Sequence, residues 1–323
     1  MQTPKNIYDL IIIGGGPIGI ACALEAEKKN LSYLILEKGC LVNSLYHYPN
    51  NMTFFSTSEK LELNGIPFIS NNPKPRKAEA LEYYRRIATS NKININLFEK
   101  VTKVKSQGEI HKITSSKGEY EAKNIVVATG FYDIPNYLNI PGEDLPKVAH
   151  YYGDPHYYAT LKTVVVGASN SAVDAALEIY RKGGDVSMIV RKEDIGSRVK
   201  YWVRPDIVNR IEEGSIKAFF NANLKEIRPN QVVIDTPEGL TTLENDFVLL
   251  LTGYRPNFDF LKSMGINLSD DGKKIPQYNK ETMETNVKGI YLAGVICGGV
   301  ETHKWFIENS RIHAKMIMED LAK

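Results

Sequence analysis

Short apolar runs, each followed directly by glycine or another small residue, recur along the chain and predict buried strands that lead into helices. The first run covers residues 8–13 and is β-branched at its end, as expected for a strand buried on both faces of a parallel sheet. A helix is predicted over residues 17–30 and a second strand over residues 32–36. The chain therefore begins with a predicted strand–helix–strand unit of an α/β fold.

The same pattern returns later. A predicted strand over residues 161–166 precedes a small-residue turn, a helix over residues 171–182 and a strand over residues 185–190. Further strands are predicted over residues 124–130, 248–252 and 289–295, with helices over residues 76–90 and 304–322. Residues 94–104 and 110–120 alternate as strands of a small antiparallel sheet. We predict two Rossmann-like dinucleotide-binding domains, of which the second (residues 146–251) is inserted in the first (residues 1–145 and 252–323).

The turn after the first strand has the pattern of a dinucleotide-binding turn. Gly14, Gly16 and Gly19 fill the three positions of G-x-G-x-x-G, which need a tight turn, close approach of a pyrophosphate and close helix–strand packing. Pro17 suits the first turn of the helix. Glu37 ends the second strand, where a carboxylate accepts hydrogen bonds from ribose hydroxyls and repels a 2′-phosphate. This turn predicts FAD or NAD; the alternative is a tight turn of another α/β protein.

The second turn differs in a way that changes the expected ligand. It keeps Gly167 but has Ser169 and Ala172 at the other two glycine positions, and both residues are small. The strand that follows ends in Arg191 and Lys192 rather than an acid, and a cationic pair matches a 2′-phosphate. This site predicts NADP, with Arg198 and Lys200 as further phosphate candidates. The alternative is a solvated charge pair.

Composition and charge narrow the class of protein. The 323 residues are 43% apolar and 24% charged, as in ordinary globular proteins, and are enough for two cores. The net charge of +2 gives no reason to expect nucleic acid or an anionic membrane as a partner. No apolar run reaches about 18 residues, and the start lacks the features of a signal peptide, so we expect a cytoplasmic protein.

Three cysteines, Cys22, Cys40 and Cys297, are widely separated in the sequence. They form no C-x-x-C, no zinc spacing and no even disulfide framework, so no metal site is predicted. A dithiol relay within the chain is therefore not expected.

Together these landmarks resemble the two-dinucleotide-binding flavoproteins, and their order is similar to that of the low-molecular-weight thioredoxin reductases. That resemblance implies FAD in the first glycine turn and NADPH in the second, with hydride transfer from NADPH to FAD and then reduction of a disulfide. The cysteine pair of thioredoxin reductases is missing here. Residues 53–61, 167–174, 200–206 and 306–311 look like those of the YpdA-type bacillithiol-disulfide reductases. This narrower resemblance implies reduction of the disulfide of a low-molecular-weight thiol.

Two residues depart from the patterns of these families. Members of the narrower family often carry a cysteine after the proline of the glycine turn, proposed to act on the substrate, where this chain has Ile18. Many relatives in the wider superfamily have aspartate after the glycine of the last turn, where this chain has Val295, so backbone N–H groups are expected to hold more of the cofactor there. Either no protein thiol is needed, or Cys297 takes that role; its alternative is a small buried core residue. His47 and His303 are candidate proton donors to a leaving thiolate, although each is also an ordinary loop histidine.

The residues predicted to act in the site fall into two groups. Candidate catalytic residues are Cys297, His47 and His303. Candidate cofactor-binding residues are Gly14, Gly16, Pro17, Ile18, Gly19, Glu37, Lys38, Ser44, His47, Thr57, Val104, Ala128, Thr129, Gly130, Gly167, Ser169, Asn170, Ser171, Ala172, Arg191, Lys192, Gly294, Val295 and Thr302.

The sequence is also compatible with three other functions. Residues 151–156 partly match the F-x-G-x-x-x-H element of flavin monooxygenases, but the gap between Gly153 and His156 is one residue short. A ferredoxin or flavodoxin reductase also needs no cysteine pair, and a flavin-loaded redox sensor needs no turnover. The predicted partner is a small-molecule disulfide, and the predicted assembly is a homodimer.

Overall fold

A computed structural model describes residues 7–323 and divides the chain into two compact units. The first unit holds the chain up to Tyr46 together with Ser56–Ile134 and Tyr254–Lys323, and the second unit holds His47–Phe55 and Pro135–Gly253. The chain crosses between them at β7 (Ile134–Pro135) and β16 (Tyr254–Arg255), which pair with each other. In this division the second unit begins at residue 135 and includes residues 47–55, while the predicted domain bounds of 146–251 stay a prediction.

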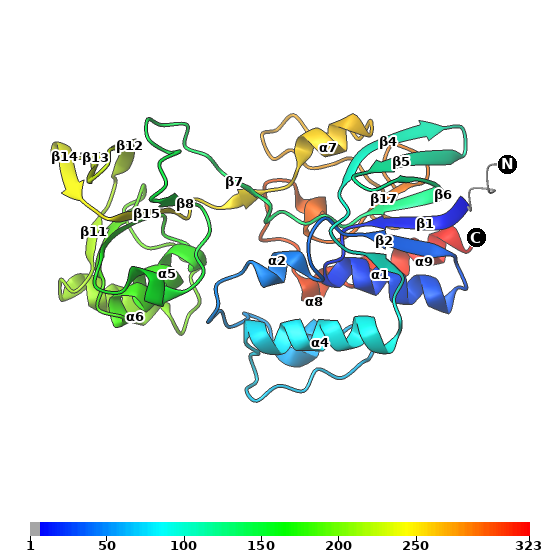
Figure 1. Cartoon of the computed structure of the whole chain (residues 1–323), viewed down its shortest axis with the longest axis horizontal. Coiled ribbons are helices and arrows are strands. Elements are labelled where there is room, and N and C mark those ends of the chain that lie inside the picture. Colours follow the sequence, from blue (N-terminus) through cyan, green and yellow to red (C-terminus); the bar gives the residue numbers. More distant parts are fainter. Residues whose placement is uncertain (1–6) are drawn as a thin grey trace. The chain divides into compact units, whose positions relative to one another are not determined.

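The first unit is built on a seven-stranded mixed sheet in the order β3-β2-β1-β6-β5-β4, with β17 also paired to β6 (Figure 1). Its strands are β1 (Ile7–Ile13), β2 (Tyr33–Leu36), β3 (Ile95–Asn96), β4 (Val101–Gln107), β5 (Ile110–Ser115), β6 (Glu119–Val127) and β17 (Ile290–Leu292). β1, β2, β3, β6 and β17 run parallel, so their carboxyl ends share one edge. The predicted antiparallel strands are present as β4 and β5, but they extend this sheet instead of forming their own.

The helices of the first unit are α1 (Pro17–Lys28), α2 (Asn43–Tyr46), α3 (Ser58–Leu61), α4 (Lys77–Ser90), α7 (Phe258–Ser263), α8 (Ile307–Ser310) and α9 (Ile312–Leu321), with a 3₁₀ turn, η2 (Val295–Gly298). α1 packs against α9. The predicted terminal helix is broken at Arg311, whose guanidinium donates to the carbonyl groups of Glu59 and Glu62 and so ties the break to α3.

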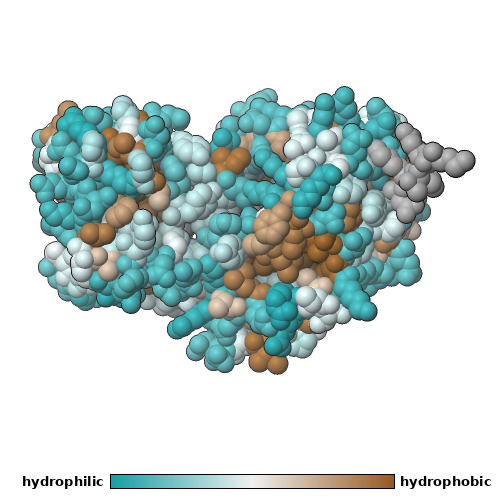
Figure 2. All heavy atoms as spheres, viewed as in Figure 1, coloured by the Kyte–Doolittle hydropathy of each residue, from teal (hydrophilic) through white to brown (hydrophobic). Residues whose placement is uncertain are grey.

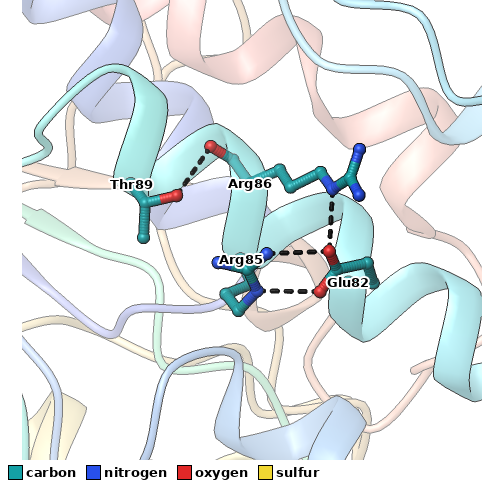
Figure 3. A network of polar contacts seen from close by, with 4 residues as sticks. All are labelled: Glu82, Arg85, Arg86 and Thr89. Carbon is teal, nitrogen blue, oxygen red and sulfur yellow. Dashed lines mark hydrogen bonds and ion pairs between the residues drawn. The ribbon is translucent and has the colours of Figure 1, made fainter.

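The exposed face of α4 carries a polar network. Glu82 accepts two hydrogen bonds from Arg85 and one from Arg86, each 2.7 Å long, and Thr89 donates to the Arg86 carbonyl (Figure 3). Exposed ion pairs of this kind contribute at most about 1 kcal/mol each. The helix is held mainly by its other face, which buries Ala80, Tyr84 and Ile87.

The second unit has a five-stranded parallel sheet, β11-β10-β9-β15-β8, and an antiparallel sheet, β12-β13-β14. Its elements are β8 (Val148–Ala149), η1 (Pro155–Tyr158), β9 (Lys162–Val166), α5 (Asn170–Arg181), β10 (Asp185–Ile189), α6 (Arg204–Glu212), β11 (Lys217–Phe219), β12 (Asn223–Ile227), β13 (Gln231–Thr236), β14 (Gly239–Glu244) and β15 (Phe247–Leu250). Val165 of β9 packs in the core with α5 and α6, while Val164 and Val166 pack with the antiparallel sheet. Alternate side chains thus fill two cores.

Both units match the predicted fold class of two Rossmann-like domains with parallel strands. The antiparallel sheet over residues 223–244 and α6 were not predicted from the sequence. Among the described residues, no helix has both the length and the apolar character that a membrane span requires.

Candidate functional site

The first glycine turn follows β1, and the space around each of its three glycines is different. Gly14 has φ +112°, and a Cβ there would lie 2.5 Å from the Ala128 carbonyl oxygen. A Cβ on Gly19 would lie 1.9 Å from the carbonyl oxygen of Gly14, so only glycine lets α1 approach β1. A Cβ on Gly16 would meet nothing within 4 Å. Crowding accounts for Gly14 and Gly19, and open space in front of Gly16 is what a pyrophosphate needs.

Glu37 ties this turn to the end of β2. Its carboxylate accepts hydrogen bonds from the N–H groups of Gly15 (2.6 Å) and Gly39 (2.8 Å), and its side chain is 6% exposed. Burial raises the pKa of Glu37, and the two backbone N–H groups act in the opposite direction. Because each carboxylate oxygen has two lone pairs, the side chain keeps acceptor capacity for ribose hydroxyls. The neighbouring Lys38 pairs with Asp133 at 2.8 Å, so this candidate cofactor residue is already engaged.

The end of β6 lies beside the same turn. The hydroxyl oxygen of Thr129 is buried and has no hydrogen-bond partner among the described residues. Gly130 has φ +70°, and a Cβ there would lie 4.0 Å from the Ser44 hydroxyl oxygen. A buried hydroxyl without a partner beside a glycine turn suits a polar ligand group, because unsatisfied buried polar atoms are costly.

The turn after β17 completes this edge of the sheet. Ala293 donates its N–H to Val127 at 3.0 Å, and Gly294 follows with φ +88°. The N–H of Gly294 donates to Nδ1 of His313 at 3.2 Å, and a Cβ on Gly294 would lie 3.4 Å from the Ile18 side chain. The expectation that backbone N–H groups replace the missing carboxylate at Val295 cannot rest on Gly294, because His313 uses that group. Sequence reasoning missed His313: a lone histidine in a terminal helix gives no motif.

Both helices that follow the glycine turns begin without a side-chain cap. The N-cap of α1 is Gly16, which has no side chain to cap the helix, and the side chain of Ser169, the N-cap of α5, makes no capping hydrogen bond. Their first N–H groups therefore remain available to an anion, and the helix dipole favours negative charge there. In the second turn Gly167 has φ +133°, and a Cβ would lie 2.6 Å from the Leu251 carbonyl oxygen and 3.2 Å from Cβ of Ala172. Gly167 in the second turn is therefore crowded by a backbone carbonyl group, as Gly14 is in the first turn.

Four cationic residues follow β10, and they differ in whether their side chains are already paired. Arg191, Lys192 and Arg198 are exposed, and their side chains have no hydrogen-bond or ion-pair partner within the described part of the chain. Lys200 is buried and pairs with Asp174 at 2.7 Å. The first three are free to bind a phosphate, whereas the ammonium of Lys200 is neutralised by its partner.

The cysteines lie in environments that oppose thiolate formation. Cys22 and Cys297 are 0% and 1% exposed, and burial raises the pKa of Cys22 to about 12 and that of Cys297 further. Sγ of Cys297 lies 3.9 Å from Nδ1 of His313. Cys40 is partly exposed, and burial raises its pKa as well. This agrees with the interpretation of Cys297 as a core residue, because the thiolate is the reactive form.

The other candidate residues are distributed over both units. His303 and Thr302 lie in the loop before α8, with His303 exposed, and Thr57 precedes α3. His47 is exposed and belongs to the second unit. Val104 is a buried core residue of β4, 4% exposed, so its side chain packs inside the protein. Among residues 7–323, no three histidine, cysteine, aspartate or glutamate side chains lie close enough together to hold a metal ion.

Figure 2 shows a hydrophobic area on the first unit, in the region where Figure 1 draws α1 and α2. Apolar surface beside a phosphate-binding turn suits a cofactor that joins a flat ring to a pyrophosphate. The family model for pyridine nucleotide-disulphide oxidoreductases matches residues 11–294, which include both glycine turns and end at Gly294, just after β17. The chain belongs to this family.

Individual relatives show which members of this family the chain is similar to. A bacilliredoxin reductase, Bdr, from Bacillus subtilis is 42% identical over 315 residues, which cover 97% of each chain. The structure of a bacillithiol disulfide reductase, Bdr (YpdA), from Bacillus cereus is 41% identical with a TM-score of 0.95, over 98% of this chain and 99% of the other. A ferredoxin–NADP reductase from Ignicoccus hospitalis is 28% identical over 299 residues, 89% of this chain and 90% of the relative. The resemblance to the YpdA-type reductases is thereby confirmed.

The protein is an FAD-dependent oxidoreductase that uses NADPH. The residues fit both cofactors: the open approach to Gly16, Glu37 and the unpartnered Thr129 hydroxyl suit FAD, and the small-residue turn at Gly167 with its three free cations suits NADPH. From the carboxylate at the end of β2 we expect FAD at the first turn, and from the cations after β10 we expect NADPH at the second.

Proposed function

We propose that this enzyme reduces the disulfide of bacillithiol, or of a closely similar low-molecular-weight thiol, at the expense of NADPH. The balanced reaction is NADPH + H⁺ + RSSR → NADP⁺ + 2 RSH. The observation that carries the proposal is near-full-length similarity to the B. subtilis and B. cereus reductases, combined with two dinucleotide turns of opposite charge preference. When bound, the flavin supplies the redox chemistry by accepting a hydride from the nicotinamide and passing two electrons to the disulfide.

We further propose that no cysteine of the chain takes part in the transfer. The two cysteines of the first-unit core, Cys22 and Cys297, are buried with raised pKa values, and neither is positioned to attack a disulfide from solvent. Ile18 occupies the position after Pro17 and is 8% exposed, so its side chain fills space against Gly294. The substrate disulfide would then be reduced by the cofactor without a mixed disulfide to the protein.

The proton for the leaving thiolate comes from a side chain or from water. His47 and His303 are both exposed and are the candidate side chains for this proton transfer. A homodimer remains part of the proposal.

A second substrate is favoured by one observation: the B. subtilis relative is named a bacilliredoxin reductase. A bacilliredoxin presents a protein disulfide rather than a small molecule. The ferredoxin–NADP reductase relative represents a third class of acceptor, an electron-transfer protein.

The test is anaerobic NADPH oxidation by the FAD-loaded protein with four acceptors offered separately: bacillithiol disulfide, glutathione disulfide, oxidised bacilliredoxin and ferredoxin. The proposal predicts fast turnover with bacillithiol disulfide and release of two thiols per NADPH. Turnover with bacilliredoxin alone would assign the protein substrate. Turnover with ferredoxin alone would replace disulfide reduction by electron transfer.

A further inference from the structure

Residues 191–200, here called the cation loop, carry Arg191, Lys192 and Arg198, the three free cations of the NADPH site. The loop also carries two exposed acids, Glu193 and Asp194, and Asp194 pairs with Arg204 outside the loop at 2.7 Å. The structure fastens this loop to the turn and first half of α5 at three places.

The first fastening is the side chain of Asn170, the first residue of α5. Its Nδ2 donates to the carbonyl oxygen of Arg198 at 3.1 Å, and its Oδ1 accepts from the N–H of Lys200 at 2.8 Å. The amide therefore bridges the backbone on both sides of residue 199 and holds the peptide next to Arg198 in one orientation. With acceptor and donor both in use, this side chain is committed to the loop.

The other two fastenings flank the first. The N–H of Gly196 donates to the Ala168 carbonyl at 3.0 Å, and a Cβ on Gly196 would lie 2.8 Å from that oxygen. Lys200 pairs with Asp174, one helical turn beyond Asn170, at 2.7 Å, with side-chain exposures of 9% and 17%. The loop thus crosses the turn at residues 168–170 and is anchored on either side of Arg198.

We propose that Asn170 is a positioning residue for cofactor selectivity: it holds Arg198 on the same side of the turn as Arg191 and Lys192, so that the three cations meet the 2′-phosphate together. This inference rests on the assignment of these cations to NADPH made above. An ordered loop binds phosphate more tightly than a mobile one, because the entropy of ordering is not lost on binding. The ordered loop therefore increases the affinity for NADPH but not for NADH, which lacks the 2′-phosphate.

The experiment measures dissociation constants of NADP⁺ and NAD⁺ for the FAD-loaded protein by titration calorimetry. The variants are Asn170→Ala, Arg198→Ala and the double variant, with Asn230→Ala as the matched control. Asn230 is exposed in the turn between β12 and β13, and its side chain makes no hydrogen bond within the described residues. A thermal melt of each variant checks that the fold is kept.

The proposal predicts that Asn170→Ala weakens NADP⁺ binding by about tenfold while NAD⁺ binding changes by less than about threefold. Because Asn170 acts through Arg198, the double variant is expected to discriminate no worse than Arg198→Ala alone. Equal weakening of both nucleotides would mean that Asn170 contacts the shared pyrophosphate, and additive effects would mean that it acts without Arg198. Either result overturns the proposal. No disulfide enters these titrations, so their outcome is independent of the proposed substrate.

Discussion

The imidazole Nδ1 of His313 accepts a hydrogen bond from the backbone N–H of Gly294 at 3.2 Å. His313 lies on α9 and is 2% exposed, and its ring packs edge-on to Trp305 with centroids 4.6 Å apart. Because Nδ1 is the acceptor, the ring is neutral with its proton on Nε2. A histidine from the terminal helix thus holds the turn after β17, where Val295 offers no polar side chain.

His313→Leu is therefore expected to weaken FAD binding by about tenfold, because the buried N–H of Gly294 loses its partner at a cost of about 1–3 kcal/mol. Fluorescence titration of the apoprotein with FAD measures this. His111→Leu is the matched control, since His111 is equally buried in the same unit but bonds Ser106 on the β4–β5 hairpin. Equal weakening by both substitutions would indicate general destabilisation instead of a role at the turn.

Stability should also depend on pH through His313. Burial lowers the pKa of His313 to about 4, below the unfolded value of about 6.5. Between these values the unfolded state binds the proton and the folded state does not, so stability is full above about pH 6.5 and falls as the pH drops towards 4. The largest contribution is about 3 kcal/mol. Melting temperatures measured from pH 7.5 to 4.5 should fall more steeply for the native protein than for His313→Leu; parallel curves would contradict the assignment.

Two alanine substitutions in the first glycine turn should behave differently. Gly19→Ala places a Cβ 1.9 Å from the Gly14 carbonyl oxygen, so it should push α1 off β1 and prevent stable folding. Gly16→Ala meets no protein atom within 4 Å and has φ −75°, so the apoprotein should melt normally while FAD binding is strongly impaired. Comparing apoprotein melts with FAD affinity separates the two effects. Normal FAD binding by Gly16→Ala would remove the pyrophosphate from this position.

Arg191→Ala tests whether the Arg191 side chain binds the 2′-phosphate of NADPH. Loss of a charge-assisted contact worth about 1.5–3 kcal/mol should raise KM for NADPH by about tenfold or more and leave KM for NADH nearly unchanged. Arg228→Ala, an exposed arginine in the β12–β13 turn of the same unit, is the control for lost charge. If both KM values rise together, Arg191 does not distinguish the two nucleotides.

The sequence predicted the parts of this fold that depend on local pattern. Each parallel strand of the two glycine-turn units was placed within a residue or two, because both faces are buried and the run is uninterrupted. The strands of residues 223–244 were missed because β14 is largely exposed and its apolar positions are few. The break at Arg311 was missed because it is set by carbonyl groups some 250 positions earlier in the chain.

The candidate site likewise has residues that local sequence predicts and residues that it does not. The glycines and the cations after β10 follow from spacing, because a turn or a strand end fixes where they lie. The roles of His313 and Asn170 depend on contacts between segments 19 and 28 to 30 residues apart, and no local pattern encodes them. Lys200 was grouped with the phosphate-binding cations, and only its contact with Asp174 shows that its charge is already paired.

In the proposed reaction a small disulfide is reduced without a protein thiol. The most direct measurement is an anaerobic stopped-flow experiment in which protein reduced by one equivalent of NADPH is mixed with bacillithiol disulfide. Flavin absorbance near 450 nm and released thiol are followed for the native protein and for Cys22→Ala, Cys40→Ser and Cys297→Ala separately. The account predicts full reoxidation with two thiols per flavin, at rates within about threefold in all four proteins. Loss of reoxidation in the native protein, or in any one folded variant, would contradict it.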